Sequence, residues 1–192
     1  MMKKIALSIA ALIWLAACQS IPDSSLPELR YTHLAPLNLN VGAVEVVSDY
    51  AAPMKAPNVD HTMPVSPGTA FKTWVNDRVK AVGQNFTARF VIKDASVVEV
   101  PLAMTKGLKG VFTTDQSERY DARLDVVVDL LDATGGSLGS ATTQVTRSIT
   151  VPEDSSLNDR EKILFEMTEG LMADLDKTLE SKIRSYLGKF VR

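Results

Sequence analysis

The residue types that most often carry catalysis or bind metal ions are few in this chain and lie far apart. There is one cysteine, Cys18, and the two histidines are His33 and His61. Neither histidine has a cysteine or clustered carboxylates near it in the sequence, as a catalytic triad or a zinc site would favour. We therefore expect no enzymatic activity, no metal ion and no cofactor.

Two other sequence patterns could indicate a ligand-binding site, but each has a simpler explanation. Asp121, Asp125 and Asp129 could suggest calcium, but residues four apart on a strand are separated by about 13 Å, too far to share one ion. A solvated strand face explains them better. The Gly107-Leu108-Lys109-Gly110 run matches neither a Walker loop nor a dinucleotide fingerprint, so it does not indicate a phosphate site.

The N-terminus has the features of an export signal. Lys3 and Lys4 precede an apolar run from Ile5 to Leu15 that only Ser8 interrupts. As a helix, a run of about 11 residues spans about 16 Å, well short of the roughly 30 Å hydrocarbon core of a bilayer. The run is therefore a poor permanent membrane span and a good signal peptide.

The segment that follows suggests lipidation. Leu15-Ala16-Ala17-Cys18 resembles the lipobox of bacterial lipoproteins, in which small residues precede the cleaved bond and the cysteine thiol receives diacylglycerol. The chain has no second cysteine with which Cys18 could form an intrachain disulfide. The alternative is an ordinary secretory signal followed by an incidental cysteine. We expect cleavage after residue 17 and a lipid on Cys18.

This interpretation divides the chain into three parts and gives it a location. We expect a cleaved signal peptide over residues 1–17, a lipidated cysteine with a Pro/Ser-rich tether over 18–36, and a single domain over 37–192. In enteric bacteria an aspartate after the lipidated cysteine commonly marks retention in the inner membrane, so Gln19 favours the outer membrane, with the domain facing the periplasm. The formal net charge of −2 and the absence of a basic cluster argue against nucleic acid as a partner.

Hydrophobic periodicity predicts an α+β fold with the order β-α-β-β-β-α. Alternation is clearest from Tyr120 to Leu131, and apolar residues three or four apart favour one long helix over residues 158–187. We expect a four-stranded, mainly antiparallel sheet covered on one face by two helices. The remaining predicted elements are strands over residues 37–48, 87–102 and 141–149 and a helix over 67–82.

A proline-rich loop over residues 51–68 is the predicted partner-binding segment. Its four prolines limit the freedom that the loop would lose on binding. Met54, Val59 and Met63 provide apolar side chains that a simple spacer would not need. The alternative is a connection with no binding role.

The order of these features resembles a known group of proteins. The features are, in order, a lipobox, a tether, a short helix with Trp74, the strand from Phe90 to Val97, the strand that opens Arg119-Tyr120-Asp121-Ala122 and a terminal helix. This order is similar to that of the small envelope lipoproteins grouped around the lipopolysaccharide-assembly lipoprotein LptE and the PqiC-type ABC-transport auxiliary lipoproteins. The resemblance implies a membrane-anchored accessory that binds an envelope protein. The alternative is a carrier that binds lipid or lipopolysaccharide in a cleft between helices and sheet.

Overall fold

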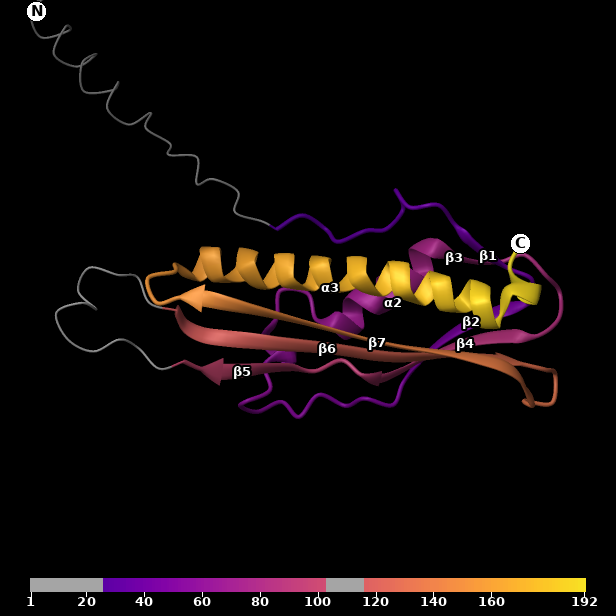
Figure 1. Cartoon of the computed structure of the whole chain (residues 1–192), viewed down its shortest axis with the longest axis horizontal. Coiled ribbons are helices and arrows are strands. Elements are labelled where there is room, and N and C mark those ends of the chain that lie inside the picture. Colours follow the sequence, from indigo (N-terminus) through magenta and orange to yellow (C-terminus); the bar gives the residue numbers. More distant parts are fainter. Residues whose placement is uncertain (1–25, 103–115) are drawn as a thin grey trace, which may run out of the picture.

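A computed structural model describes residues 26–102 and 116–192 (Figure 1). The predicted signal peptide, the lipobox, Cys18 and the Gly107–Gly110 run lie outside the described residues. The fold is α+β. Its helices are α2 (Pro67–Arg78) and α3 (Leu157–Tyr186), with short 3-10 turns η2 (Asp60–Thr62) and η4 (Gly188–Phe190). Its strands are β1 (Leu37–Leu39), β2 (Ala43–Ser48), β3 (Val79–Ala81), β4 (Thr87–Asp94), β5 (Val97–Pro101), β6 (Gln116–Leu131) and β7 (Ser137–Pro152).

The main sheet is built around β6, which is 16 residues long. Strand β7 pairs with it antiparallel along its whole length, and β4 and β5 follow one another along its other side, also antiparallel. A register shift after Ile92 and a hydrogen bond from the Ser96 amide to the Asp94 carboxylate break the predicted 87–102 strand into these two. The sheet therefore has five strands and not the expected four, although β4 and β5 together occupy the place of one.

The segment predicted as one strand over residues 37–48 is instead two strands in different sheets. The Gly42 amide bonds to the carbonyls of Asn85 and Phe86, and a Cβ added at Gly42 would lie 2.6 Å from the Gln84 carbonyl oxygen. This close approach turns the chain, so that β1 pairs with β3 while β2 joins the edge of the main sheet. Both pairs are parallel, so the expected mainly antiparallel pairing holds for β4 to β7 and the main sheet is mixed at its β2 edge.

The predicted helix over residues 67–82 ends four residues early. Ser66 accepts a hydrogen bond from the Thr69 amide and Pro67 occupies the first turn, as the sequence indicates. At the other end, Val79 takes extended backbone angles and pairs with Leu37. A β-branched residue suits that strand better than a further helical turn.

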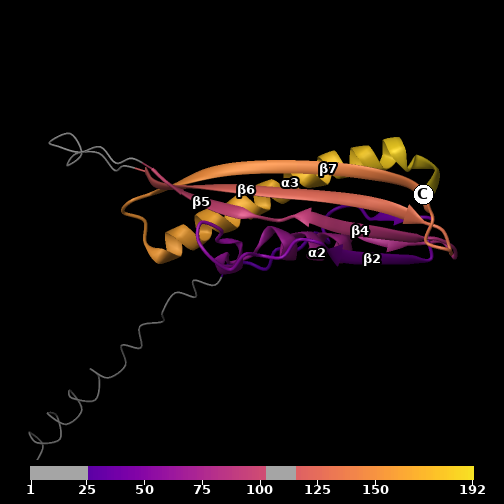
Figure 2. The same ribbon diagram turned by 90° about the horizontal axis from the view of Figure 1, so that it is seen from below.

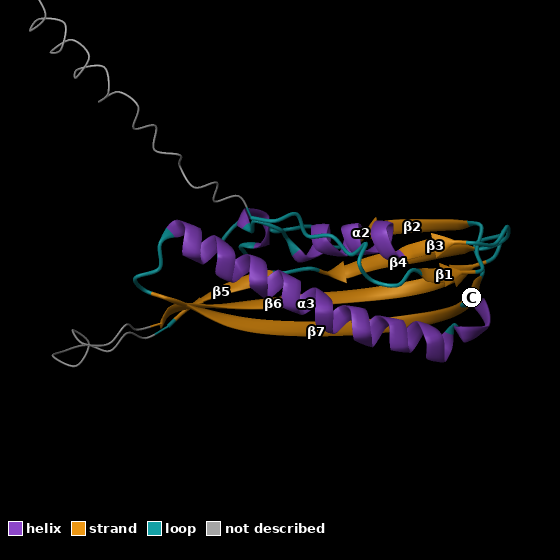
Figure 3. Cartoon of the chain, turned by 90° about the horizontal axis from the view of Figure 1, so that it is seen from above, coloured by secondary structure: helices purple, strands orange, loops and turns teal. Residues whose placement is uncertain are grey.

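Both helices cover the same face of the sheet, as predicted. Seen from above, α3 crosses the strands obliquely with α2 beside it, and from the opposite side the strands lie in front of the helices (Figures 3 and 2). On β6 the predicted inward row is fully buried from Leu124 to Leu130. The same core contains the buried row of α3, which is Leu171, Leu175, Leu179 and Ile183. Phe71, Trp74 and Phe90 fill the space between α2 and the sheet, with the Phe71 and Trp74 rings stacked 5.9 Å apart.

The long helix agrees with its sequence prediction to within one residue at each end. Ser156 caps its N-terminus by accepting a hydrogen bond from the Asp159 amide. At 30 residues it extends for about 45 Å, nearly the length of the sheet. Within the described part of the chain, no helix is both long and apolar enough to cross a membrane.

We expect Leu124→Asp to unfold the domain and Asp125→Asn to leave it folded. Leu124 is fully buried, so an unpaired carboxylate there should lower the free energy of unfolding by at least about 4 kcal/mol. Asp125 points to the other face, where its pair with Arg123 is worth at most about 1 kcal/mol. Urea denaturation followed by circular dichroism measures both. Similar midpoints for the two variants would show that the faces of β6 have been assigned wrongly.

Candidate functional site

The described part of the predicted tether belongs to the domain. The Arg30 guanidinium forms two hydrogen bonds with the Asp77 carboxylate, at 2.8 and 2.6 Å, and the Tyr31 amide donates to the same carboxylate. Tyr31 is buried in the core, and the Ala35 carbonyl accepts from Arg78. Arg30, Tyr31 and Ala35 of the predicted tether are therefore held against the helices.

A buried polar network lies directly below this segment and joins the two helices. Asp176 on α3 accepts from the Trp74 indole at 2.7 Å and forms an ion pair with Arg78 on α2, which also pairs with Glu180. Arg78 is only 5% exposed, and its guanidinium lies 5.7 Å from the centre of the Trp74 ring. Burial raises the pKa of Glu180, but hydrogen bonds from Arg78 and Arg184 outweigh it and leave that pKa below its usual value.

A cleft of about 370 Å³ opens between this N-terminal segment and α3. Leu29, Leu34 and Met172 give it apolar walls, and Glu169, Asp176 and Lys177 add charge at its sides. Tyr31 also belongs to the lining, and its hydroxyl is buried and has no hydrogen-bond partner among the described residues. Burial raises the pKa of this hydroxyl well above its usual value. The cleft lies on the outer side of α3, not between the helices and the sheet.

The proline-rich loop is more closely integrated into the domain than the sequence suggested. Its residues 57–59 pair with the edge strand β5, since the Glu99 amide donates to Pro57 and the Val59 amide donates to Val97. The four prolines therefore do not keep the loop off the sheet. Met63 belongs to the hydrophobic core, and Val59 packs against that core.

Only Met54 of the three predicted contact residues presents a largely exposed side chain, at 66%. The partner-binding role of these three residues stays a prediction. The fold itself accounts for Met63 and Val59, so they need no partner to explain them.

The face of the sheet opposite the helices is polar and hollowed. A depression of about 730 Å³ lies over β5, β6 and β7, lined by Ser96, Val98, Arg119, Asp121, Ala122, Arg123, Thr146 and Ser148. Arg119 and Ser148 both donate to Asp121, and these hydrogen bonds hold its pKa below the usual range. Arg123 lies 3.1 Å from Asp94 and donates to Gln144. Of the three predicted solvated aspartates, Asp121 and Asp125 thus form ion pairs with Arg119 and Arg123 of the same strand.

Sequence reasoning missed two features of the chain. Asp176 and Glu180 have the charged side chains typical of a solvated helix face, and only the tertiary structure reveals their contacts with Trp74 and Arg78. Gly135-Gly136-Ser137-Leu138-Gly139 has the G-x-S-x-G spacing of serine hydrolases. It lies at the turn between β6 and β7, where the strand-to-helix turn that exposes such a nucleophile is missing.

Comparison with known proteins gives only distant structural similarity. No protein-family model and no curated protein matches this chain. A minor lipoprotein from Acinetobacter baumannii is 14% identical, with 77% of this chain and 93% of that chain covered and a TM-score of 0.37. A candidate lipoprotein from Caulobacter crescentus is 16% identical, with 72% and 91% covered and a TM-score of 0.31. A protein from Xanthomonas campestris is 10% identical, with 81% and 96% covered and a TM-score of 0.30. At these values the similarities do not assign a function.

We expect Asp176→Ala to be far more destabilising than Asp174→Ala, two residues away on the same helix. Loss of Asp176 leaves the Trp74 indole without its acceptor and Arg78 with only Glu180, which should cost about 3 to 5 kcal/mol. Asp174 forms an exposed pair with Arg147, worth about 0 to 1 kcal/mol. Tryptophan fluorescence during urea denaturation reports this, because Trp74 is the one tryptophan beyond the predicted signal peptide. Equal midpoints would mean that the network does not hold the helices together.

Proposed function

We propose that this chain is a bacterial envelope lipoprotein, anchored through a lipid on Cys18, that acts as a non-catalytic accessory in envelope assembly or transport. The observation that carries the proposal is the order of features at the N-terminus. Two lysines, an apolar run too short to span a bilayer, and small residues lead directly to the only cysteine in the chain. Buried acyl chains contribute about 0.8 kcal/mol per CH₂, and two or more of them give a stable anchor.

The proposed anchor keeps the domain close to the bilayer. The ten residues from Gln19 to Glu28 reach at most about 33 to 36 Å when fully extended, and Leu29 is the first residue that packs against the core. Beyond them, Arg30 and Tyr31 are already bound to Asp77 on α2. The spacer between lipid and fold is therefore shorter than the predicted tether, and Gln19 supports placement at the outer membrane.

We propose that a protein partner binds the hollowed face of the sheet. This face is polar and open, and the two helices leave it uncovered on the described residues. Arginine is enriched in protein interfaces, and Arg119 and Arg123 project here from a rigid central strand. Their ion pairs with Asp121 and Asp94 fix the side chains in place, which reduces the entropy lost on binding. The loop around Met54 is the alternative contact.

A second candidate function, that of a lipid or lipopolysaccharide carrier, is favoured by one observation. The cleft beside α3 has apolar walls from Leu29, Leu34 and Met172, which could contact an acyl chain. However, the space between helices and sheet is filled by Phe71, Trp74 and Phe90. A carrier would therefore have to use this outer cleft. Lipid extracted with the purified protein, and lost in a Leu34→Glu variant that is still folded by circular dichroism, would favour this function over the first, because Leu34 lines the cleft and is only half-buried.

Lipidation is tested by Cys18→Ala. The wild-type protein should incorporate labelled palmitate and accumulate as a precursor in the presence of globomycin, whereas the variant should take up no label, because it has no other thiol. Wild-type protein without label would contradict the lipoprotein assignment.

The partner-binding face is tested by photocrosslinking in cells. A photoreactive amino acid at Thr146, in the depression, should give a discrete crosslinked protein, whereas the same amino acid at Glu166, exposed on α3, should not. The crosslink should weaken at least fivefold in an Arg123→Glu variant. A crosslink from Met54 but not from Thr146 would transfer the interface to the loop and contradict the proposal.

A further inference from the structure

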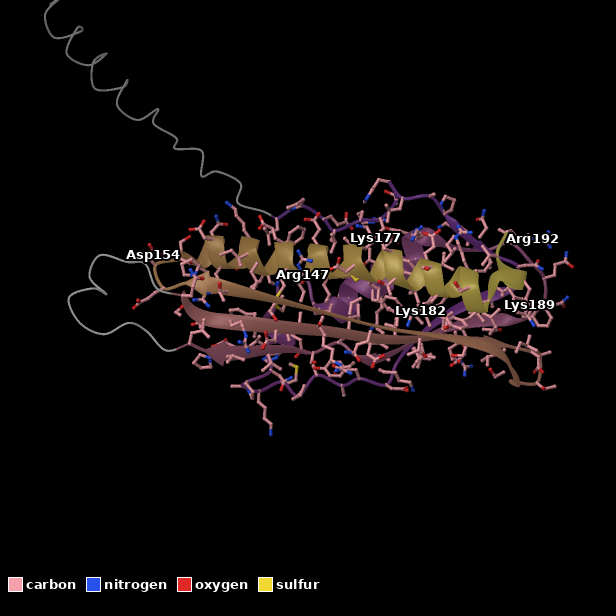
Figure 4. All side chains as sticks on the ribbon, in the orientation of Figure 1. Arg147, Asp154, Lys177, Lys182, Lys189 and Arg192 are labelled. Atoms are coloured by element: carbon pink, nitrogen blue, oxygen red, sulfur yellow. The ribbon has the colours of Figure 1, made fainter. Side chains whose placement is uncertain are left out.

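The charges on α3 and its flanking residues differ between the two ends of the molecule. Residues 153–169 contain six carboxylates and two basic side chains, whereas residues 177–192 contain five basic side chains and one carboxylate. Figure 4 shows Asp154 at one end of the molecule and Lys189 and Arg192 at the other. Such a distribution suits the helix dipole, which favours acidic residues at the N-terminus and basic residues at the C-terminus. The charges alone therefore indicate no partner.

The basic end also exposes apolar side chains. Tyr186 is 69% exposed, Val82 is 51% exposed and Phe86 is 38% exposed. They are three of the six large apolar side chains classed as exposed on the described residues. The stability of α3 does not explain why Val82 and Phe86 are exposed here, since both residues belong to the turn between β3 and β4 and lie outside the helix.

Contacts within the fold bring these groups together from three parts of the chain. The Phe86 ring packs edge-on against Phe190 at 5.8 Å, and the Lys189 ammonium lies 4.9 Å from the Phe190 ring centre. The Arg192 amide bonds to Asn38, and Asn38 in turn pairs with Lys80 in the β1–β3 register. We call this surface the basic end and define it by Lys80, Val82, Phe86, Tyr186, Lys189 and Arg192.

The acidic groups near the basic end are already engaged. Glu180 pairs with Arg78 and Arg184. In the turn between β6 and β7, Asp132 accepts hydrogen bonds from Thr134 and Gly136, which lower its pKa and keep it charged. This single carboxylate is outnumbered by Lys80, Lys189 and Arg192, so the end stays positive.

We propose that the basic end rests on an anionic membrane surface. Lysine and arginine beside exposed aromatic and aliphatic side chains are the composition that binds the headgroup region, where the cations meet phosphate and the apolar groups enter the acyl boundary. The proposal rests on the lipid anchor at Cys18, which brings the domain to the bilayer.

The basic end supplies what the anchor alone does not, namely an orientation. A spacer of at most about 33 to 36 Å holds the domain near the membrane but lets either end of a helix about 45 Å long approach it. With the basic end on the bilayer, the acidic end around Asp154 and Leu157 points away from it. The hollowed sheet face then stays free for a partner.

The orientation can be measured on the lipidated full-length protein in phospholipid vesicles. Cys18 carries the lipid, so one introduced cysteine is the only thiol available for a fluorescent dye. Gln84→Cys places the dye in the turn between Val82 and Phe86, and Leu157→Cys places it at the acidic end on a residue that is 73% exposed. In vesicles of phosphatidylethanolamine and phosphatidylglycerol, brominated lipid should quench the dye at position 84 at least threefold more than the dye at 157.

Two controls distinguish binding of the basic end to anionic lipid from mere nearness of the anchored domain to the bilayer. Replacing the anionic lipid with phosphatidylcholine, or adding Lys189→Glu and Arg192→Glu together, should remove the difference between the two positions. Equal quenching at both positions in the anionic vesicles, or a difference that survives the charge reversal, would overturn the proposal. Two dyes per chain would show that Cys18 is free, and would overturn the anchor as well as the orientation that depends on it.

Discussion

The packing of α3 on the helix-facing side of β6 and β7 determines the rest of the structure. The two strands have 16 residues each and pair along their whole length, and the helix of 30 residues, about 45 Å long, crosses them obliquely (Figure 3). The helix and the sheet each contribute a row of buried side chains to one core. Once this face is covered, alternation along β6 places Asp121, Arg123 and Asp125 on the opposite face, which stays polar and open. The shape of the proposed partner surface therefore follows from the core.

The buried network of Trp74, Arg78 and Asp176 adds polar contacts between the helices to this apolar packing. It ties α2 to α3 and orders the segment that leads from the proposed anchor, because Arg78 also holds the Ala35 carbonyl. A buried ion pair is seldom a large source of net stability, but loss of one partner is costly. Such a network favours one arrangement over its alternatives, here the seating of residues 30–36 on the helices. The described chain is therefore held against α2 from Arg30 onward.

The sequence predicts those elements whose pattern is long and regular. The alternation from Tyr120 to Leu130 and the helical spacing from Leu164 to Ile183 each extend over many residues, and both predictions are confirmed. Strands β1 and β3 have three residues each, too few for any periodicity, and they exist because Leu37 and Val79 meet in the fold. The parallel pairing of β2 with β4 likewise depends on the turn at Gly42.

The candidate sites likewise include features that the sequence pattern predicts and features that depend on the tertiary structure. The polar face of β6 could be predicted because its residues alternate with the core, whereas the depression could not, since it needs Ser96 and Thr146 from neighbouring strands. Met63 and Met54 have the same residue type in the same loop, and only the tertiary structure shows that one is buried and the other exposed. Signals such as that around Cys18 act on the unfolded precursor, so they can be recognised without knowledge of the fold.

The central claim is that a lipid at Cys18 anchors this domain. The intact mass of the protein purified from membranes in detergent tests it most directly. The account predicts a chain that begins at Cys18 and is heavier than its amino-acid mass by one diacylglyceryl group, with or without a third acyl chain on the amino group. A chain that begins at Cys18 or beyond with no added mass would contradict it.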